Sequence, residues 1–169
     1  MPARPIVFYP DERLNRPAAP VERFDETLAG LVRDIGDTMI AAPAVGLTAV
    51  HIGVPLRVTM IRLDLSRPAS VYVNPEVLWA SQETAAHTEG SVSLPGLSEE
   101  VTRPARVRVG YLTAEGEWRE DEADGFLAAT LQHEIDQLDG VFWLARLSRL
   151  KRERLLKKAG KLRRADRPD

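Results

Sequence analysis

Residues 124–140, D-G-F-L-A-A-T-L-Q-H-E-I-D-Q-L-D-G, decide how the rest of the chain must be arranged. Apolar residues recur along this stretch at helical spacing and a second flank is apolar or small, which predicts a helix covered by protein on both sides. Asp124 is placed to cap its start, and Gly140 to end it. Because a buried polar group costs free energy unless it is paired or has a task, the polar residues of this helix are candidates for function: His133, Glu134, Asp136 and Gln137.

The polar residues form the pattern H-E-x-x-Q, one residue away from the H-E-x-x-H of metallohydrolases. In the complete pattern, two histidines on one helix face bind a metal and the glutamate is the general base. Here Gln137 replaces the second histidine, and a neutral amide is a poor ligand for zinc or ferrous iron. Taken alone, the pattern favours a core helix whose His133 is satisfied by hydrogen bonds.

The composition indicates a single globular domain over residues 1–169. Apolar residues make up 44% of the chain and charged residues 28%, which is ordinary for a protein with a hydrophobic core. No run is long and apolar enough to span a membrane, and the first residues lack a signal-peptide core, so we expect a cytoplasmic protein. The chain has no cysteine, which excludes any thiolate metal ligand, and it has three histidines: His51, His87 and His133.

The net charge of -2 is unevenly distributed along the chain. Residues 146–169 hold eleven Arg or Lys and three acidic residues, whereas residues 1–145 hold twelve basic and twenty-two acidic residues. A solvated helix face is the usual meaning of such a basic run. The charge also suggests an anionic partner.

The remaining patterns predict short strands and two further helices. Asp25 caps one helix with an apolar stripe, and Ser148 caps a last, basic helix at about residues 148–165. Between them we expect strands at residues 57–63, 71–73 and 107–111, extended or loop structure at 87–95, and turns at Asn74-Pro75 and Glu115-Gly116. Short strands followed by a buried helix indicate an α+β fold.

Three stretches, in this order, resemble the motifs of peptide deformylases, which remove the formyl group from the N-terminal methionine of new bacterial polypeptides. They are V-G-L-T-A-V-H at residues 45–51, E-G-S-V-S-L-P at 89–95 and Q-H-E-I-D-Q at 132–137. The corresponding family patterns are G-x-G-L-A-A-x-Q, E-G-C-L-S and Q-H-E-x-D-H. Y-P-D-E-R-L at residues 9–14 and L-S-R-L-K-R at 147–152 also match, so the resemblance covers essentially the whole chain.

This resemblance implies antiparallel strands around the central H-E-x-x-Q helix, with a helix at the C-terminus. It also implies a metal held by the motif-two cysteine and both motif-three histidines, with the motif-three glutamate as base. The motif-one glutamine and the backbone N–H after the cysteine steady the formyl oxygen. The implied partners are the N-terminus of a nascent peptide and, through the terminal helix, the ribosome; neither DNA nor a membrane is expected.

At the metal-site positions, the resemblance leaves one ligand and the base. His133 stands at one histidine position, and Glu134 at that of the base. Ser91 stands at the cysteine position and Gln137 at the second histidine position. A serine hydroxyl is not ionised at neutral pH, and a neutral amide binds zinc or iron weakly, so two of three ligands are substituted.

At the substrate-binding positions, Val45 and Gly46 keep the strand that faces the substrate, and Gly46 permits close approach of a peptide. The N–H of Val92 keeps the place of an oxyanion donor. His51 stands where the family has glutamine, so histidine and glutamine have changed places between motifs one and three.

This exchange leaves two interpretations of the pocket. A rearranged site would bind Zn or Fe through His51 and His133, with Ser91, Glu134 or water. We favour a metal-free pocket, in which His51 and Gln137 hydrogen-bond each other or His133.

The roles of three further groups are supported by fewer observations. An extended segment points His87, Glu89 and Ser91 the same way, but a surface or strand-end position is the simpler interpretation of His87. Asp136 faces away from His133, and we expect it to anchor the helix. A nucleophilic triad of Ser91, His133 and an acid lacks a visible orienting group.

Three functions therefore compete. The first is a deformylase-like protein whose pocket binds the N-terminal formyl-methionine of a nascent peptide, while metal-dependent hydrolysis is lost or strongly impaired. The second is an active hydrolase with the rearranged metal site. The third is a ribosome-associated protein acting through its basic C-terminal helix. We favour the first, with Glu134 and His51 as the catalytic positions.

Overall fold

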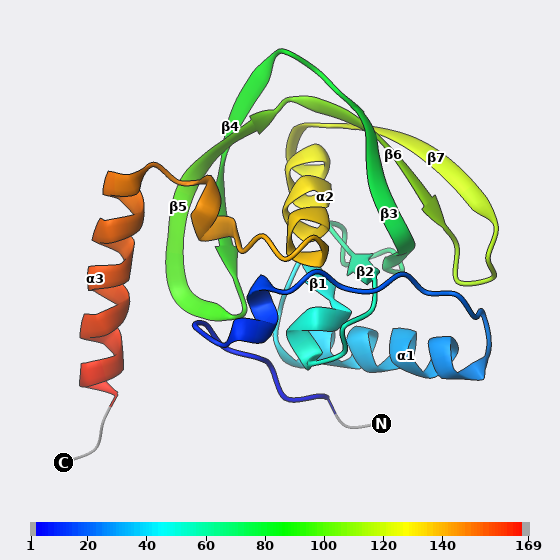
Figure 1. Ribbon diagram of the computed structural model, residues 1–169, viewed down its shortest axis with the longest axis horizontal. Coiled ribbons are helices and arrows are strands. Elements are labelled where there is room, and N and C mark those ends of the chain that lie inside the picture. Colours follow the sequence, from blue (N-terminus) through cyan, green and yellow to red (C-terminus); the bar gives the residue numbers. More distant parts are fainter. Residues whose placement is uncertain (1–2, 167–169) are drawn as a thin grey trace.

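The computed structural model describes residues 3–166, and Figure 1 shows how their helices and strands are arranged. One helix, α2, lies at the centre, and strands curve around it. In chain order, the elements are η1 (Glu12–Asn15), α1 (Glu26–Ala41), β1 (Gly46–Thr48), η2 (Ala49–Ile52), β2 (Val58–Ile61), β3 (Ser70–Ala80), β4 (Thr84–Ser91), β5 (Leu94–Pro104), β6 (Arg106–Leu112), β7 (Trp118–Asp124), α2 (Gly125–Leu138), η3 (Trp143–Arg146) and α3 (Arg149–Ala165).

The strands form two antiparallel sheets that meet α2 from different sides. Five of them form one sheet in the order β1-β2-β3-β6-β7, and β4 pairs with β5 in a separate hairpin. In Figure 1 the β4–β5 hairpin lies on one side of α2, and β3, β6 and β7 lie on the other. The predicted α+β fold, with antiparallel strands around the central helix and a C-terminal helix, is confirmed.

Helix α2 is buried because its apolar residues face two different hydrophobic clusters. Leu131 and Ile135 pack with Val107 and Val109 of β6. One turn further on, Leu138 packs in a second cluster with residues of η1, β5 and η3. The helix ends at Leu138, and Gly140 follows two residues later with a φ of 80°, which glycine readily adopts. Asp124 lies at the N-cap as predicted, although its side chain makes no capping hydrogen bond.

Helix α1 covers the opposite end of the large sheet. The Asp25 carboxylate caps it by accepting hydrogen bonds from the backbone N–H groups of Thr27 and Leu28, at 3.0 and 3.4 Å. Its predicted apolar stripe packs on β2 and β3 in a third cluster, with Leu28, Leu31, Ile35 and Met39 buried. This packing fixes the sheet edge at β1, which borders the site described below.

Two expectations about the strands differ from the structure. The predicted turn at Asn74-Pro75 is wrong, because both residues lie inside β3, where the register with β6 shifts between Val73 and Glu76. Asn74 has a φ of 49°, and its side chain bonds the N–H and the carbonyl of Val21. The pair therefore makes an irregularity that bends the strand. The long strand β5, which supplies half of the hairpin, was not anticipated beyond its first residues.

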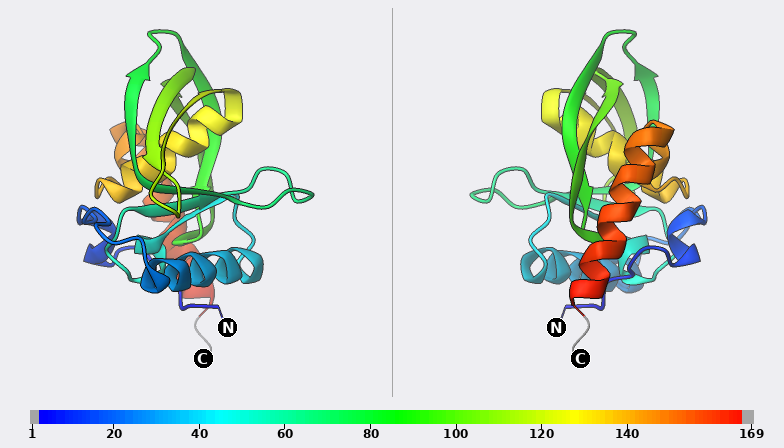
Figure 2. Two further views of the ribbon diagram at one scale, coloured as in Figure 1. Left: turned by 90° about the vertical axis from the view of Figure 1, so that its right-hand side faces the viewer. Right: turned by 90° about the vertical axis from the view of Figure 1, so that its left-hand side faces the viewer.

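Helix α3 stands at the flank of the molecule, against β5 (Figures 1 and 2). Ser148 caps it by accepting a hydrogen bond from the N–H of Lys151. Leu155 and Ala159 are buried in the cluster that contains Leu138 and residues of β5. Glu99 of β5 pairs with Lys151 and Arg154. No helix among residues 3–166 is long and apolar enough to cross a membrane. Residues 1–2 and 167–169, which belong to the predicted domain and its basic run, lie outside the described residues.

Candidate functional site

The predicted site residues gather at one cavity of about 460 Å³ between β1, η2, the β4–β5 turn and α2. All six contribute to its lining: Val45, Gly46, His51, Val92, His133 and Glu134. The lining includes polar side chains, among them His51, His133 and Glu134. It also includes small or apolar side chains, among them Val45, Phe126 and Ala129. A larger cavity, of about 820 Å³, lies against another face of α2, but its arginines are held in ion pairs.

Glu134 is the most confined acid of the cavity. Its side chain is 3% exposed, and its Oε2 atom has no hydrogen-bond partner. Burial disfavours the charged carboxylate and raises its pKa to about 7, although the nearby His133 opposes this shift. A carboxyl group with a pKa near neutrality can accept or release a proton at physiological pH, as a general base must.

Gly46 makes room for this carboxyl group. A Cβ atom at Gly46 would lie 2.5 Å from Oε1 of Glu134, closer than any such contact allows. The expected close approach at this glycine is therefore present, but its partner within the chain is Glu134. Any side chain at position 46 would displace the carboxyl group from its place.

His51 is held by Thr48 through a capping box at the start of η2. The backbone N–H of Thr48 donates to Nδ1 of His51 at 3.0 Å, and the Thr48 hydroxyl oxygen lies 2.9 Å from the same nitrogen. In return, the N–H of His51 donates to that hydroxyl at 3.3 Å. His51 is 2% exposed, and burial, together with the nearby His133, lowers its pKa to about 3, so the ring is neutral at pH 7. Its Nε2 atom has no partner.

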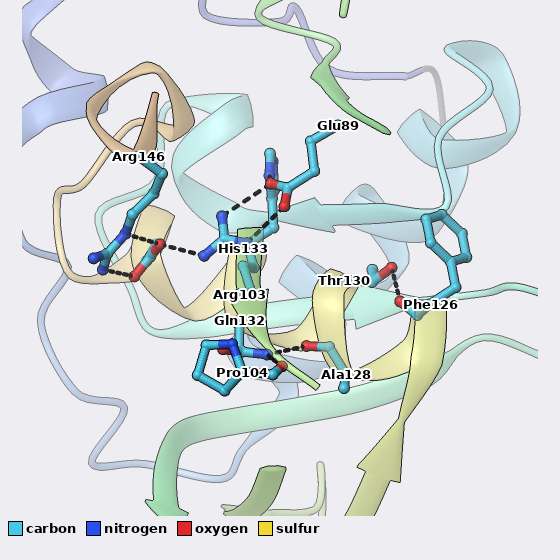
Figure 3. Close-up of polar contacts among 10 residues, drawn as sticks. Glu89, Arg103, Pro104, Phe126, Ala128, Thr130, Gln132, His133 and Arg146 are labelled. Atoms are coloured by element: carbon cyan, nitrogen blue, oxygen red, sulfur yellow. Dashed lines mark hydrogen bonds and ion pairs between the residues drawn. The ribbon is translucent and has the colours of Figure 1, made fainter. Parts of the chain in front are cut away.

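His133 is oriented by Glu89, which sequence reasoning did not identify as a site residue. Nδ1 of His133 lies 2.7 Å from Oε1 of Glu89 (Figure 3). Burial lowers the pKa of His133, but the hydrogen bond to Glu89 and the nearby Glu134 outweigh this effect and raise it. Burial also raises the pKa of Glu89, yet its bonds to Arg103 and His133 prevail and hold it at about 2. Glu89 is therefore a carboxylate that fixes the direction of the His133 ring.

A buried ion-pair network continues from Glu89 to another face of α2. Arg103 binds Glu89 through Nε and Nη2, at 2.6 and 2.9 Å, and donates to Asp136 through Nη1 at 2.8 Å. Arg146 adds two bonds to Asp136, at 2.8 and 2.7 Å (Figure 3). Asp136 thus ties α2 to β5 and η3, the anchoring role expected of it. The sequence held a signal for Arg103, which shares an inward strand face with Leu97 and Val101, where a cation needs an acid.

Gln137 and Ser91 are engaged elsewhere. Gln137 is 2% exposed and donates through Nε2 to the carbonyl of Leu14 at 2.7 Å, outside the cavity lining. The hydrogen bond expected between Gln137 and His51 or His133 is therefore not formed. Ser91 borders the cavity, and its hydroxyl oxygen accepts from the N–H of Ser93 at 3.1 Å rather than meeting His133. The geometry of a nucleophilic triad is thus missing at these residues.

His87 lies outside the cavity lining although β4 is extended through it. Its ring is half-buried and faces that of Phe126, with centroids 6.2 Å apart. Phe126 itself is 45% exposed and lines the cavity. His87 therefore contacts a residue of the cavity wall without lining the cavity itself.

The sequence and the fold of this chain are similar to those of known proteins. The family model described as polypeptide deformylase matches residues 3–153. A "peptide deformylase-like" protein of Rhizobium meliloti (strain 1021) is 54% identical over 166 residues, which is 98% of this chain and 96% of that protein. The crystal structure of a peptide deformylase from Legionella pneumophila is 40% identical, with a TM-score of 0.90 over 98% of this chain and 99% of that one. The peptide deformylase of Ehrlichia chaffeensis in complex with actinonin is 34% identical, with a TM-score of 0.90 over 99% and 100% of the two chains.

Proposed function

The chain belongs to the polypeptide deformylase family, and we propose that its pocket binds the N-terminal formyl-methionine of a nascent peptide while metal-dependent deformylation is lost or strongly impaired. The family is one of hydrolases that act on formyl-methionyl peptides. Within that activity, the proposal separates binding of the substrate, which the pocket retains, from activation of water, which needs a metal.

The shape and polarity of the cavity support the binding half of the proposal. A formyl-methionine has a small polar head and a longer apolar side chain. The cavity lining offers polar side chains, such as His51 and Glu134, and apolar ones, such as Val45 and Phe126. In Figure 3, Phe126 and Thr130 lie together beside the start of α2. The Thr130 hydroxyl donates to the carbonyl of Phe126 at 2.8 Å, so it presents no unpaired proton to an apolar side chain.

The side chains at the family's metal-ligand positions support the second part of the proposal, the loss or impairment of deformylation. Deformylases normally use iron or zinc, and a catalytic zinc site needs three protein ligands. At the family's ligand positions, His133 is the one imidazole, Ser91 offers a neutral hydroxyl, and Gln137 is bonded to Leu14 outside the cavity lining. Among residues 3–166, no group of three or more His, Cys, Asp or Glu side chains is arranged to hold a metal ion. The side chains present at these positions do not fit the metal, and this mismatch is the observation that carries the proposal.

The consequences for catalysis follow from Glu134. A metal lowers the pKa of its bound water from ~16 towards ~7, and a carboxylate alone cannot supply that activation. Glu134 can hold or move a proton beside a bound carbonyl group. The N–H of Val92 and the ring of His51, two residues that line the cavity, are the groups we expect to bond the carbonyl oxygen. These groups favour binding and orientation of a formyl peptide, with slow hydrolysis at most.

We expect the purified protein to release formate from formyl-Met-Ala at a negligible rate and to carry far less than one zinc, iron or nickel per chain. Restoring the ligands with Ser91→Cys and Gln137→His, together with His51→Gln, should produce metal binding and measurable hydrolysis. Elemental analysis and a formate assay test both statements on the same samples. Turnover by the unchanged protein on the order of 10 per second, typical of enzymes, would refute the proposal.

Two further interpretations stay predictions. A hydrolase with Zn or Fe held by His51 and His133 requires a free lone pair on Nε2 of His51. Ribosome association through α3 rests on its exposed basic residues, Arg149, Lys157, Lys158, Lys161, Arg163 and Arg164. Binding of that kind would weaken steeply with salt as counterions are released.

A further inference from the structure

The cavity contains two deeply buried polar atoms that have no partner. They are Nε2 of His51 and Oε2 of Glu134, in side chains that are 2% and 3% exposed. Five such side-chain atoms occur among residues 3–166, and these two belong to the lining of the same cavity. A buried polar group without a hydrogen-bond partner is costly, so two of them at one cavity point to a ligand that completes their hydrogen bonds.

The position of the ring proton of His51 follows from Thr48. A backbone N–H can only donate, and that of Thr48 points at Nδ1 of His51 over 3.0 Å. Nδ1 must therefore present its lone pair, and the single proton of the neutral ring must sit on Nε2. The Thr48 hydroxyl, 2.9 Å from the same nitrogen, can donate to it as well. Thr48 is fully buried at the end of β1, which keeps both contacts away from water.

This tautomer makes His51 a donor and not a metal ligand. To bind a metal through Nε2, the ring needs its lone pair there and its proton on Nδ1, where metal-binding histidines usually donate to an acceptor. At His51, a proton on Nδ1 would meet the N–H of Thr48 head-on. Metal binding at Nε2 would therefore require the turn between β1 and η2 to rearrange.

We propose that Thr48 fixes His51 as an Nε2–H donor, so that the pocket recognises the carbonyl oxygen of an N-acyl amide, such as an N-terminal formyl group, without a metal. Thr48 acts as a positioning residue, and His51 as the group that touches the ligand. Glu134 supplies the complementary acceptor for an N–H. The inference rests on the proposed function. It deepens that function by naming the chemical class of the bound group, an N-acyl amide, and the residue that binds its oxygen, His51.

A free N-terminal amine does not satisfy this arrangement. An ammonium group can donate to Glu134, but it cannot accept from Nε2 of His51, which is left unpaired. Because a site built to bond a group rejects an analogue that lacks it, we expect formyl-Met-Ala-Ser to bind at least tenfold more tightly than Met-Ala-Ser.

The tautomer is tested directly by nitrogen-15 NMR of the histidine rings in the full-length protein at neutral pH. We expect a protonated Nε2 and an unprotonated Nδ1 for His51, with signals that do not move on addition of zinc. Thr48→Val removes the hydroxyl but keeps the backbone N–H that donates to Nδ1, so the ring proton should stay on Nε2 in this variant as well. A proton on Nδ1, or a zinc-dependent shift of the ring signals, overturns the proposal.

Recognition is tested by calorimetric titration with the same two peptides, before and after treatment with a strong chelator. We expect chelation to change nothing and His51→Leu to weaken formyl-peptide binding about tenfold or more. His51→Gln, which keeps an N–H donor, should stay within about threefold of the unchanged protein. Correct folding of each variant is checked by its thermal unfolding.

The outcomes separate this inference from the proposed function. Binding that chelation abolishes leaves the proposed function standing and overturns the metal-free recognition. If neither peptide binds, but N-methylformamide perturbs the Nε2 signal of His51, the peptide function fails and carbonyl recognition stands. If no N-acyl compound binds or perturbs that signal, both are refuted.

Discussion

Two faces of helix α2 carry buried polar groups, which are fully paired on one face and partly unpaired on the other. On one face, Asp136 is held by Arg103 and Arg146, and Arg103 also holds Glu89. On the cavity face, Glu134 is as deeply buried, yet one of its oxygens has no partner. Burial alone therefore does not tell a structural acid from a functional one. What separates them is whether the protein itself completes their hydrogen bonds.

The two glutamates show what pairing does to a buried carboxyl group. Glu89 and Glu134 are 7% and 3% exposed, and burial raises the pKa of both. Bonds from Arg103 and His133 bring the pKa of Glu89 down to about 2, whereas that of Glu134 stays near 7. The same side chain is thus a permanent anion on one side of His133 and a proton carrier on the other.

The largest expected effect comes from breaking the paired face. Arg103→Met leaves Glu89 and Asp136 as buried charges without their shared cation, so we expect the free energy of unfolding to fall by about 3–5 kcal/mol. Urea denaturation at pH 7 measures it. The matched control is Arg119→Met, which removes an exposed partner of Glu117 and should cost less than ~1 kcal/mol. Equal losses in the two variants would mean that the network has no special structural role.

An effect of the opposite sign is expected on the cavity face. The pKa of Glu134 in the folded protein, about 7, lies above its ordinary value of 4.5, so its ionisation destabilises the fold as the pH rises from 4.5 to 7. Glu134→Gln should therefore raise the free energy of unfolding at pH 8 by ~3 kcal/mol, and the gain should vanish below about pH 4.5.

Glu89→Gln is the counterpart of that variant. The pKa of Glu89 in the folded protein, about 2, lies below its ordinary value of 4.5, so its contribution to stability is present above pH 4.5 and is lost as the pH falls towards 2. The substitution should destabilise the protein at neutral pH. Denaturation curves of both variants from pH 4 to 8 would contradict the comparison if the two substitutions changed stability in the same direction at pH 8.

A smaller effect is expected at His51. The pKa of His51 in the folded protein, about 3, lies below its ordinary value of 6.5. The unfolded chain therefore binds more protons between these values, and stability falls as the pH falls from 6.5 towards 3. Between pH 6.5 and 5, this effect should lower the free energy of unfolding by about 2 kcal/mol. His51→Gln should remove that part of the dependence of stability on pH. His87→Gln is the control. An unchanged acid slope in His51→Gln would show that the ring is not held neutral.

Much of this arrangement was predictable because local patterns determine it. The helical spacing of apolar residues fixed α1 and α2, and the predicted cap residue Ser148 begins α3. The six pocket residues could be assembled only through a family resemblance, since β1, the β4–β5 turn and α2 are far apart in the chain. The partners of Asp136 and Gln137 escaped prediction because Arg103, Arg146 and Leu14 meet them only in the folded protein. The turn predicted at Asn74-Pro75 is wrong because an irregular strand and a turn use the same residue types.

The bond from Gln137 to the carbonyl of Leu14 has a consequence for how this site can change over generations. Leu14 is fully buried, so an imidazole at position 137 that turned towards the cavity would leave its carbonyl unsatisfied, at about 1–3 kcal/mol. A single Gln137→His replacement gains no metal site while Ser91 remains, and it loosens the contact between α2 and the N-terminal segment. Obtaining the family's ligand set at these positions therefore requires Gln137→His and Ser91→Cys together, because the first alone is expected to lower stability with no metal site in return.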